Sequence, residues 1–359
     1  MTRLSTLAAV ALLFMVANVL LFGLGCSTIA AEHILTFGSN GGKKPIPEEF
    51  ETTLFDDVWI VRVQDDPPVD LVVWILEPRP FRIWVDATTS TSPPAEMAKE
   101  PFGEVTVKKA GRPMILIQWD RPNPKAAAPP RGTVMMLQGQ GGCNRTAYVM
   151  WPIAAALADA GYRVILPDLR SQGDSTGKEL GFIVKDAQDI RTVLNVLEQD
   201  HLLAGKVGVL GHSYGAAVGG YTATLDDRLA TCVLSGLPMT WRGIIEYQGS
   251  KNLLWRLMTD GARERTFQRC GERMGYDIDS MDARTFVTET DRPLLLLHGR
   301  NDSYVPVGHA TEIYNARPDG TRLVIYEDAD HGDYFWTRFD EVRDLCLSWF
   351  AEHLATTPE

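Results

Sequence analysis

The pattern of hydrophobic and polar positions changes character at about residue 131. Before this point, short strand-like runs are separated by turns rich in Pro and Asp. After it, solid apolar runs alternate with longer segments whose apolar residues recur at helical spacing. The predicted strands are 58–63, 71–76, 82–85, 104–107 and 114–119, followed by 132–137, 163–167, 207–210, 229–234, 293–297 and 322–326. The predicted helices are 148–160, 183–199 and 340–353.

This alternation defines the fold class. Strands that are apolar throughout and lie between helices are typical of a parallel sheet that is covered on both faces. We therefore expect residues 131–354 to form an α/β domain, interrupted by a helical insertion that contains Trp and Arg at 236–292. In the β-rich N-terminal region, 48–130, we expect 104–119 to be a hairpin that supplies the first strands of the main sheet. The strands before that hairpin are expected to be a small addition.

The first 25 residues have the pattern of an export segment, because Arg3 precedes an apolar run over 7–24. The run ends at Gly25-Cys26-Ser27, which resembles the bacterial lipoprotein signal, in which a cysteine is lipidated after cleavage. Its length of roughly 18 residues also suits an uncleaved membrane anchor, and ordinary secretion is a third possibility. All three place the remainder in the cell envelope or beyond, outside the cytoplasm. The polar, Gly-rich segment 26–47 is expected to be a tether.

Composition excludes several classes of protein. The 359 residues include 35 Lys and Arg against 46 Asp and Glu, a formal net charge of −11 that disfavours nucleic-acid binding. Five cysteines are too few for a disulfide framework or a CxxC zinc module. If Cys26 carries lipid, four cysteines remain: Cys143, Cys232, Cys270 and Cys346. Any disulfide pairing among them is left open, and the alternative is that they are small buried thiols.

The candidate chemistry begins with Gly211-His212-Ser213-Tyr214-Gly215, which follows a predicted strand and precedes a segment of small residues. In a strand–turn–helix context, G-x-S-x-G predicts a nucleophile elbow, whose tight turn exposes the serine hydroxyl and requires small neighbours. The helix that follows favours negative charge developing at the serine. Ser213 is therefore the candidate nucleophile.

A serine nucleophile needs a base, and the base needs an orienting acid. Asp302 follows the strand 293–297, and His331 follows the strand 322–326, so both are expected at the carboxyl edge of the sheet, where ligands bind in such folds. Of seven histidines, His331 alone combines a position after the last strand with a following Gly. Three acids beside it in sequence compete with Asp302, and we expect them to cap or to be solvated: Asp328, Asp330 and Asp333.

Amide donors for an oxyanion are expected from the residue after the nucleophile and from the loop after the strand 132–137. These are the backbone amides of Tyr214 and Gln140. The loop lacks the last Gly of GxGxxG, and no GK[ST] follows, which argues against a nucleotide site. The chemistry expected here requires no cofactor and no metal.

Taken together, residues 131–354 resemble the α/β-hydrolase superfamily, and within it the branch of serine aminopeptidase-like enzymes, monoglyceride lipases and lysophospholipases. The resemblance is carried by the motifs 211–215, 297–302 and 330–332, and by 167–175, which is similar to that branch's D-x-R-G-x-G-x-S loop. The sequence departs from the family at Gln138, where His is usual, and at Ser171, where Gly is usual.

The resemblance implies that the insertion 236–292 is a helical cap over an acyl pocket. Its apolar side chains are then expected either to line a cavity or to pack the cap onto the core: Trp241, Ile244, Ile245, Tyr247, Leu253, Leu254, Trp255 and Met258. Six basic residues against three acids over 251–273 fit either an anionic substrate or lipid headgroup, or a solvated helix face.

The expected function is a serine hydrolase that cleaves small carboxylic esters, or amides and peptides, through an acyl-enzyme, and that is held at a membrane by its N-terminus. Two alternatives stay open. One is acyl transfer or carbon–carbon hydrolysis by the same triad, and the other is an envelope binding protein without catalysis.

Overall fold

The computed structural model describes residues 27–35, 54–86, 97, 101, 103–107, 114–119, 129–141 and 150–354. It divides into two compact units, which we describe separately. Unit 1 comprises 1–37 and 240–282, and unit 2 comprises 38–239 and 283–359. The export segment with Cys26, most of the expected tether and Cys143 lie outside the described residues.

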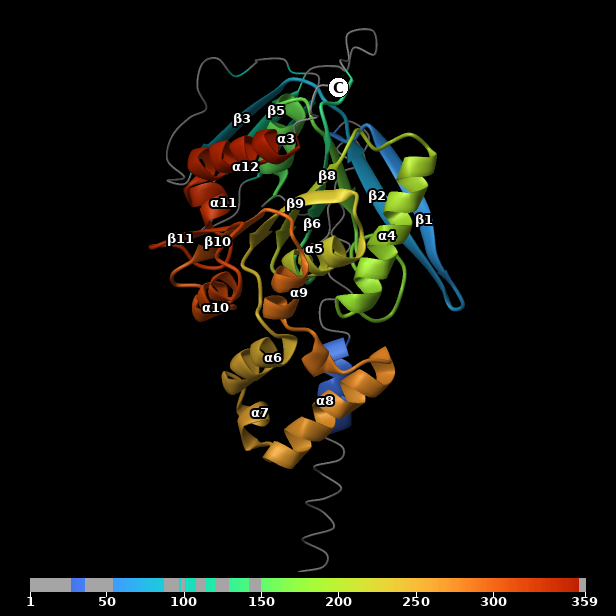
Figure 1. Cartoon of the computed structure of the whole chain (residues 1–359), viewed down its shortest axis with the longest axis vertical. Helices are drawn as coiled ribbons and strands as arrows, with labels where there is room; N and C mark the ends of the chain where they lie inside the picture. The colour runs from blue at the N-terminus through green and yellow to red at the C-terminus, as the bar shows by residue number, and fades with distance from the viewer. Residues whose placement is uncertain are drawn as a thin grey trace, which may run out of the picture. The chain divides into compact units, whose positions relative to one another are not determined.

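Unit 2 is built on an eight-stranded sheet of order β1-β2-β7-β6-β8-β9-β10-β11 (Figure 1). The two N-terminal strands pair antiparallel, with each other and with β7, and all other pairings are parallel. The strands are β1 (Asp57–Asp65), β2 (Pro68–Leu76), β6 (Thr133–Leu137), β7 (Arg163–Pro167), β8 (Val207–His212), β9 (Leu229–Ser235), β10 (Leu294–Gly299) and β11 (Thr321–Tyr326). The α/β fold with a mostly parallel sheet is confirmed.

Helices cover both faces of this sheet. Alternate strand residues such as Val134 and Met136 share one core with α3 and α12, whereas Leu137 and Val209 lie under Gly219 of α5. This division follows from the two-residue period of a strand, because both parities are apolar and each needs its own cover. The helices of the unit are α3 (Trp151–Asp159), α4 (Val184–Gln199), α5 (Tyr214–Leu225), α9 (Ala283–Glu289), α10 (Gly308–Ala316), α11 (Tyr334–Thr337) and α12 (Phe339–His353).

The N-terminal β-region corrects one expectation. The hairpin over 104–119 is present, but it belongs to a separate three-stranded sheet of order β3-β5-β4, formed by β3 (Phe81–Asp86), β4 (Gly103–Val107) and β5 (Met114–Trp119). The strands before it, β1 and β2, extend the main sheet instead. The reason lies in β2, whose residues 71–76 are apolar throughout and largely buried, as a strand with neighbours on both sides requires.

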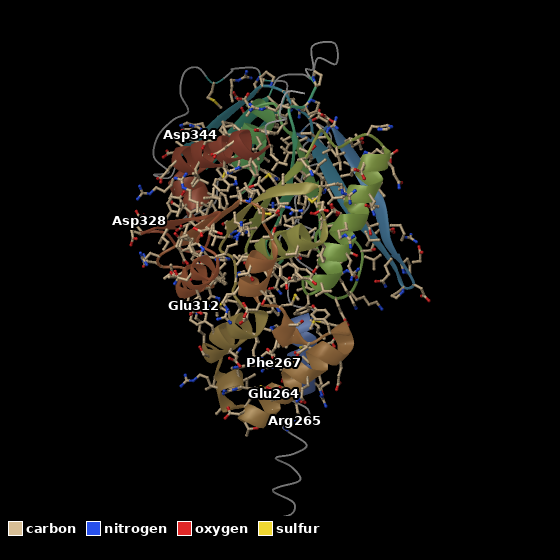
Figure 2. All side chains as sticks on the ribbon, in the orientation of Figure 1. Glu264, Arg265, Phe267, Glu312, Asp328 and Asp344 are labelled. Atoms are coloured by element: carbon tan, nitrogen blue, oxygen red, sulfur yellow. The ribbon has the colours of Figure 1, made fainter. Side chains whose placement is uncertain are left out.

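Unit 1 contains α6 (Trp241–Ser250), α7 (Leu253–Leu257), α8 (Asp260–Met274) and the short η1 (Ile278–Ser280). Arg242 pairs with Glu264 and Asp279, and its guanidinium lies 4.1 Å from the ring centre of Phe267; Figure 2 labels Glu264 and Phe267 on α8. Both ends of the insertion meet, because Thr240 and Asp282 form an antiparallel bridge. The inserted segment of unit 1 therefore begins and ends at one junction, and its range of 240–282 is shorter than the expected 236–292.

The expectation that 26–47 is a tether is wrong for residues 27–35. Residues 27–35 form a helix of unit 1 whose Ser27, Ala31 and Leu35 are buried, and Glu32 pairs with Arg273 of α8. The four-residue spacing of the buried positions places them on one helical face. In the part of the chain that the structure describes, no helix has the length and apolarity needed to cross a membrane.

Candidate active site

Ser213 lies at the point where β8 ends and α5 begins. Its backbone has φ 53° and ψ −116°, a conformation that is unfavourable for a residue with a side chain and that persists only where its surroundings enforce it. Its N–H donates to the carbonyl oxygen of Ser235, at 2.7 Å, which ties the turn to the end of β9. The strand–turn–helix context expected from the sequence is therefore present.

The two elbow glycines are required by close packing. A Cβ at Gly211 would lie 2.5 Å from the carbonyl oxygen of Gly215. A Cβ at Gly215 would lie 2.5 Å from the carbonyl oxygen of Gln138 and would also clash with that of Leu137. The beginning of α5 thus approaches the end of β6 more closely than any side chain permits, and this approach sets the position of Ser213.

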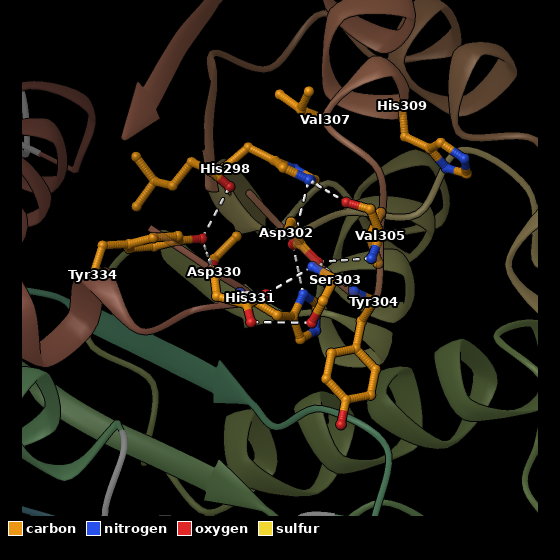
Figure 3. A network of polar contacts seen from close by, with 12 residues as sticks. His298, Asp302, Ser303, Tyr304, Val305, Val307, His309, Asp330, His331 and Tyr334 are labelled. Atoms are coloured by element: carbon orange, nitrogen blue, oxygen red, sulfur yellow. Dashed lines mark hydrogen bonds and ion pairs between the residues drawn. The ribbon is translucent and has the colours of Figure 1, made fainter. Parts of the chain in front are cut away.

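The structure brings Asp302 and His331 together. Nδ1 of His331 lies 2.7 Å from Oδ2 of Asp302 (Figure 3). The carboxylate is wholly buried, and 14% of the imidazole side chain is exposed. Because an ionised carboxylate only accepts, Nδ1 carries the proton and Nε2 is left as the basic nitrogen.

Asp302 is itself held from three sides. Its Oδ1 accepts the N–H groups of Tyr304 and Val305, at 2.9 and 2.7 Å. His298 places Nε2 at 2.8 Å from the carbonyl oxygen of Val305 and 3.4 Å from Oδ2 of Asp302. The carbonyl can only accept, so His298 donates from Nε2, and burial lowers its pKa so that it is neutral. These contacts fix the carboxylate that orients His331 (Figure 3).

The three competing acids have other partners. Asp330 accepts the N–H and hydroxyl of Ser303 and the N–H of His331. Asp333 accepts the N–H of Asp330, and Asp328 pairs with Arg338. Of the four acids weighed, Asp302 alone contacts the His331 ring in the described hydrogen bonds. The other three bind backbone N–H groups, the Ser303 hydroxyl or a surface arginine, as expected for loop acids.

The two expected oxyanion donors lie in elements that flank Ser213. Tyr214 is the first residue of α5, so its amide is at the positive end of that helix. Gln140 lies in the turn after β6, and a Cβ at the adjacent Gly139 would be 3.4 Å from Cβ of Ser213. The structure therefore brings both segments to the serine.

A hydrogen-bonded chain lies beside His331, and sequence reasoning missed it. His212 places Nδ1 at 3.0 Å from Oγ of Ser235, which is 2.6 Å from the hydroxyl of Tyr334, which in turn donates to the carbonyl oxygen of Leu297. Each hydroxyl has one proton, so the direction is fixed: Nδ1–H of His212 donates to Ser235, and Ser235 donates to Tyr334. Burial holds the pKa of His212 well below its usual value.

This chain keeps a neutral imidazole beside the candidate base. The ring centres of His212 and His331 are 4.8 Å apart. A second positive charge at that distance would disfavour protonation of His331, and the neutral state of His212 avoids this repulsion. The sequence shows His212 only as a variable position of the G-x-S-x-G motif, and no signal in it identifies Ser235 or Tyr334 as partners.

A buried carboxyl group contacts the residue that follows the nucleophile. The hydroxyl of Tyr214 donates to Oδ2 of Asp186 in α4, and the N–H of Ile183 donates to both groups. Asp186 is fully buried and its Oδ1 has no hydrogen-bond partner. Burial, followed by the nearby charge of Asp189, raises the pKa of Asp186 to about 6. An acid at an apolar position of the predicted helix 183–199 was the signal available in the sequence.

Two further findings bear on cofactors and thiols. Among the described residues, no cluster of three or more His, Cys, Asp or Glu side chains has the arrangement of a metal site. Cys232, Cys270 and Cys346 are buried, and burial raises the pKa of Cys232 and of Cys346 to about 12. Cys232 and Cys346 are therefore protonated thiols.

Comparison with known proteins identifies the architecture. A family model described as "alpha/beta hydrolase fold" matches residues 132–273. The uncharacterised protein YqkD of Bacillus subtilis is 24% identical over 185 residues, which cover 48% of this chain and 57% of YqkD. The chain thus spans less than two thirds of the length of that relative.

Two solved structures share the fold at low identity. An esterase of Pyrococcus furiosus superposes with a TM-score of 0.58 at 16% identity, covering 87% of this chain and 95% of that one. The acylaminoacyl peptidase of Pyrococcus horikoshii gives a TM-score of 0.52 at 14% identity, covering 86% and 43%. With the sheet order, the elbow at Ser213 and the matching family model, these likenesses lead to one conclusion. The chain is a protein of the alpha/beta hydrolase fold.

Proposed function

We propose that this protein is a serine hydrolase that cleaves carboxylic esters through an acyl-enzyme. The fold supports a hydrolase, and the observation that carries the proposal is the 2.7 Å hydrogen bond between His331 and the wholly buried carboxylate of Asp302. That bond fixes the tautomer in which Nε2 of His331 accepts a proton. Ser213, held in a strained turn at the same edge of the sheet, is the hydroxyl that we assign as the proton's donor.

The proposed reaction has two balanced steps. Oγ of Ser213 attacks the ester carbonyl while His331 takes the hydroxyl proton, and the amides of Tyr214 and Gln140 stabilise the oxyanion. Collapse of the tetrahedral intermediate releases the alcohol, which takes the proton from His331, and leaves an acyl-serine. Water then attacks the acyl group with the same base, and the acid product leaves while Ser213 regains its proton.

Active-site labelling tests this assignment. We expect a fluorophosphonate probe to modify the wild-type protein at Ser213, and to leave Ser213→Ala and His331→Ala unlabelled. Hydrolysis of short-chain p-nitrophenyl esters should fall by at least about 10³-fold in Ser213→Ala. The matched control is Ser348→Ala, in which an exposed serine of α12 is removed. Full activity of Ser213→Ala would refute the proposal.

The same experiments separate the alternatives. A folded wild-type protein that neither reacts with the probe nor hydrolyses esters is the outcome expected of a binding protein. Acyl transfer is distinguished by adding an alcohol or amine acceptor and measuring whether acyl product partitions to it in preference to water. The esterase likeness favours esters over amides as the first substrates to assay.

We also propose that the protein is exported and attached to a membrane by residues 1–26. The support is the apolar run 7–24 and the Gly25-Cys26-Ser27 sequence that ends it. Incorporation of labelled fatty acid that is lost in Cys26→Ser would indicate a lipoprotein. An N-terminal residue before 26 on the membrane-bound protein would indicate an anchor, and release of the whole protein into the medium would refute attachment.

A further inference from the structure

Unit 1 carries an exposed apolar surface, formed by three leucines of α7. Leu253, Leu254 and Leu257 are 67, 73 and 71% exposed. Ile29, 72% exposed, belongs to the same unit. These four are among the five large hydrophobic side chains of the described residues that are at least 67% exposed. A cluster of exposed leucines on one short helix marks a surface that contacts a partner protein or a membrane.

The leucines are exposed because α7 is held by its other face. The Trp255 ring packs on Phe267 of α8, with ring centres 5.9 Å apart. Arg263 donates to the carbonyl oxygen of Trp255 at 3.1 and 3.3 Å, and the side chain of Asn252 accepts the N–H of Leu254 at the beginning of the helix. The helix is thus fixed to α8 by its tryptophan, and the outward direction of the leucines is a property of its packing.

Positive charge lies around these leucines. Lys251 precedes the leucines and Arg256 lies between Leu254 and Leu257, and both are exposed. The Lys251 ammonium lies 4.1 Å from the ring centre of Tyr247. Over 251–273 the chain has six basic residues and three acids, although its net charge is −11. Apolar side chains next to exposed cations match a lipid bilayer, which has an apolar interior and an anionic surface.

The N-terminus provides the geometric argument. The helix 27–35 is part of unit 1, where Ala31 and Leu35 are buried and Glu32 pairs with Arg273. The apolar run ends at residue 24, three peptide steps before this helix, a span of at most about 10 Å. A lipid on Cys26 would be closer still. Either form of attachment therefore joins the chain to the bilayer directly at unit 1.

We propose that Leu253, Leu254 and Leu257 insert into the surface of a lipid bilayer, with Lys251 and Arg256 among its headgroups. The proposal rests on the membrane attachment proposed above and deepens it, because it assigns the membrane-facing surface of the domain itself. The alternative occupant, a second copy of the chain, is an outcome of the test.

The test places a fluorophore on α7 of the full chain. Leu254→Cys is labelled with an environment-sensitive dye in a Cys143→Ser background, since the three described cysteines are buried. In the anchored form, in which Cys26 carries no lipid, Cys26→Ser is added. The control carries the dye at Asp319→Cys, an exposed position of unit 2. Both proteins are incorporated into phosphatidylcholine–phosphatidylglycerol vesicles that contain lipids with a quencher on the acyl chain. We expect quenching at 254 to exceed quenching at 319 at least about three-fold, and aqueous iodide to show the reverse order.

A polar variant links this signal to the leucines. With Leu253→Ser and Leu257→Ser added, quenching of the 254 dye should fall to the level of the 319 dye while the protein still floats with the vesicles. Equal lipid quenching at 254 and 319 in the unmutated background would overturn the proposal. Protection of the 254 dye without vesicles, together with a concentration-dependent sedimentation coefficient, would assign the patch to a second copy.

Failure of the underlying proposals is recognised separately. A chain that does not float with vesicles refutes the membrane attachment and this inference with it. The quenching readout involves no catalysis, so it is independent of the hydrolase assignment. Far-UV circular dichroism checks that the variant with Leu253→Ser and Leu257→Ser is folded, which we expect because the substituted leucines are exposed.

Discussion

Replacing Asp186 with Asn tests whether the carboxyl group beside Tyr214 stays protonated in the folded protein up to about pH 6. The pKa of Asp186 is raised to about 6, first by burial and then by the charge of Asp189. The hydroxyl of Tyr214, the guanidinium of Arg170 and the N–H of Ile183 act in the opposite direction and are outweighed. The charged and titratable groups that face the carboxyl are therefore Asp189 from α4, Tyr214 from α5 and Arg170 from the loop after β7.

The magnitude follows from linkage. The unfolded chain has the ordinary aspartate pKa of 3.8, so folding raises the pKa by about 2 units, which corresponds to about 3 kcal/mol. Between pH 3.8 and about 6 the folded protein binds more protons at this group than the unfolded chain does. The contribution of Asp186 to stability is therefore fully present below the unfolded pKa and is lost as pH rises through about 6. The side chain is wholly buried, so solvent does not weaken the effect.

Asn has the same shape, does not titrate, and keeps an oxygen acceptor for Tyr214 and Ile183. We therefore expect the free energy of unfolding of Asp186→Asn, relative to wild type, to rise by about 2–3 kcal/mol between pH 4 and pH 7. Urea unfolding followed by tryptophan fluorescence at several pH values measures this difference, and groups common to both proteins cancel. Asp260→Asn, at a fully exposed carboxylate, is the control. A wild-type minus variant difference that does not change with pH would refute the reasoning.

Three further changes test the packing around the site by denaturant unfolding. Ser235→Ala leaves the Nδ1–H of His212 without its acceptor and removes one of the two hydrogen bonds of the Tyr334 hydroxyl, so it should lower the free energy of unfolding by about 1–3 kcal/mol. An unchanged midpoint would contradict the contribution of this hydrogen-bonded chain to stability. Gly215→Ala drives a methyl group onto the carbonyl of Leu137 and should cost about 1–3 kcal/mol or more, whereas wild-type stability would mean that α5 can move away. Arg170→Met leaves the buried charge of Asp189 unpaired and should cost about 3–5 kcal/mol, and adding Asp189→Leu should recover much of that loss; no recovery would argue that the arginine acts through packing alone.

The sequence predicted the parallel part of the fold because its strands are apolar on both faces. The predicted strand 163–167 agrees with β7 at both ends, and 229–234 differs from β9 by one residue. The N-terminal sheet was misassigned because an apolar run shows that a strand has two buried faces but not which sheet supplies its neighbours. Residues 71–76 met the first condition, and only the tertiary pairing with β7 shows where they belong.

The candidate site divides in the same way. Ser213, Asp302 and His331 were located from motif and strand order, since parallel strands bring their carboxyl ends to one edge. Their supporting groups come from side chains whose partners are far apart in sequence: Ser235 with Tyr334, and Tyr214 with Asp186. No local pattern encodes such pairs. The buried acid in an amphipathic helix was a visible anomaly, but its partner became evident only with the fold.

The junction of the inserted helices has a consequence for protein engineering. Thr240 and Asp282 are bridged, and the N–H of Ala283 donates to the carbonyl oxygen of Met239 at 2.7 Å, so the two ends of the segment are already closed. Replacing the segment between them with a short turn adds little loop-closure entropy and leaves every strand of the eight-stranded sheet intact. The chain is in this sense modular, and grafting inserts from related proteins at this site changes one part of the molecule while the hydrolase scaffold is kept.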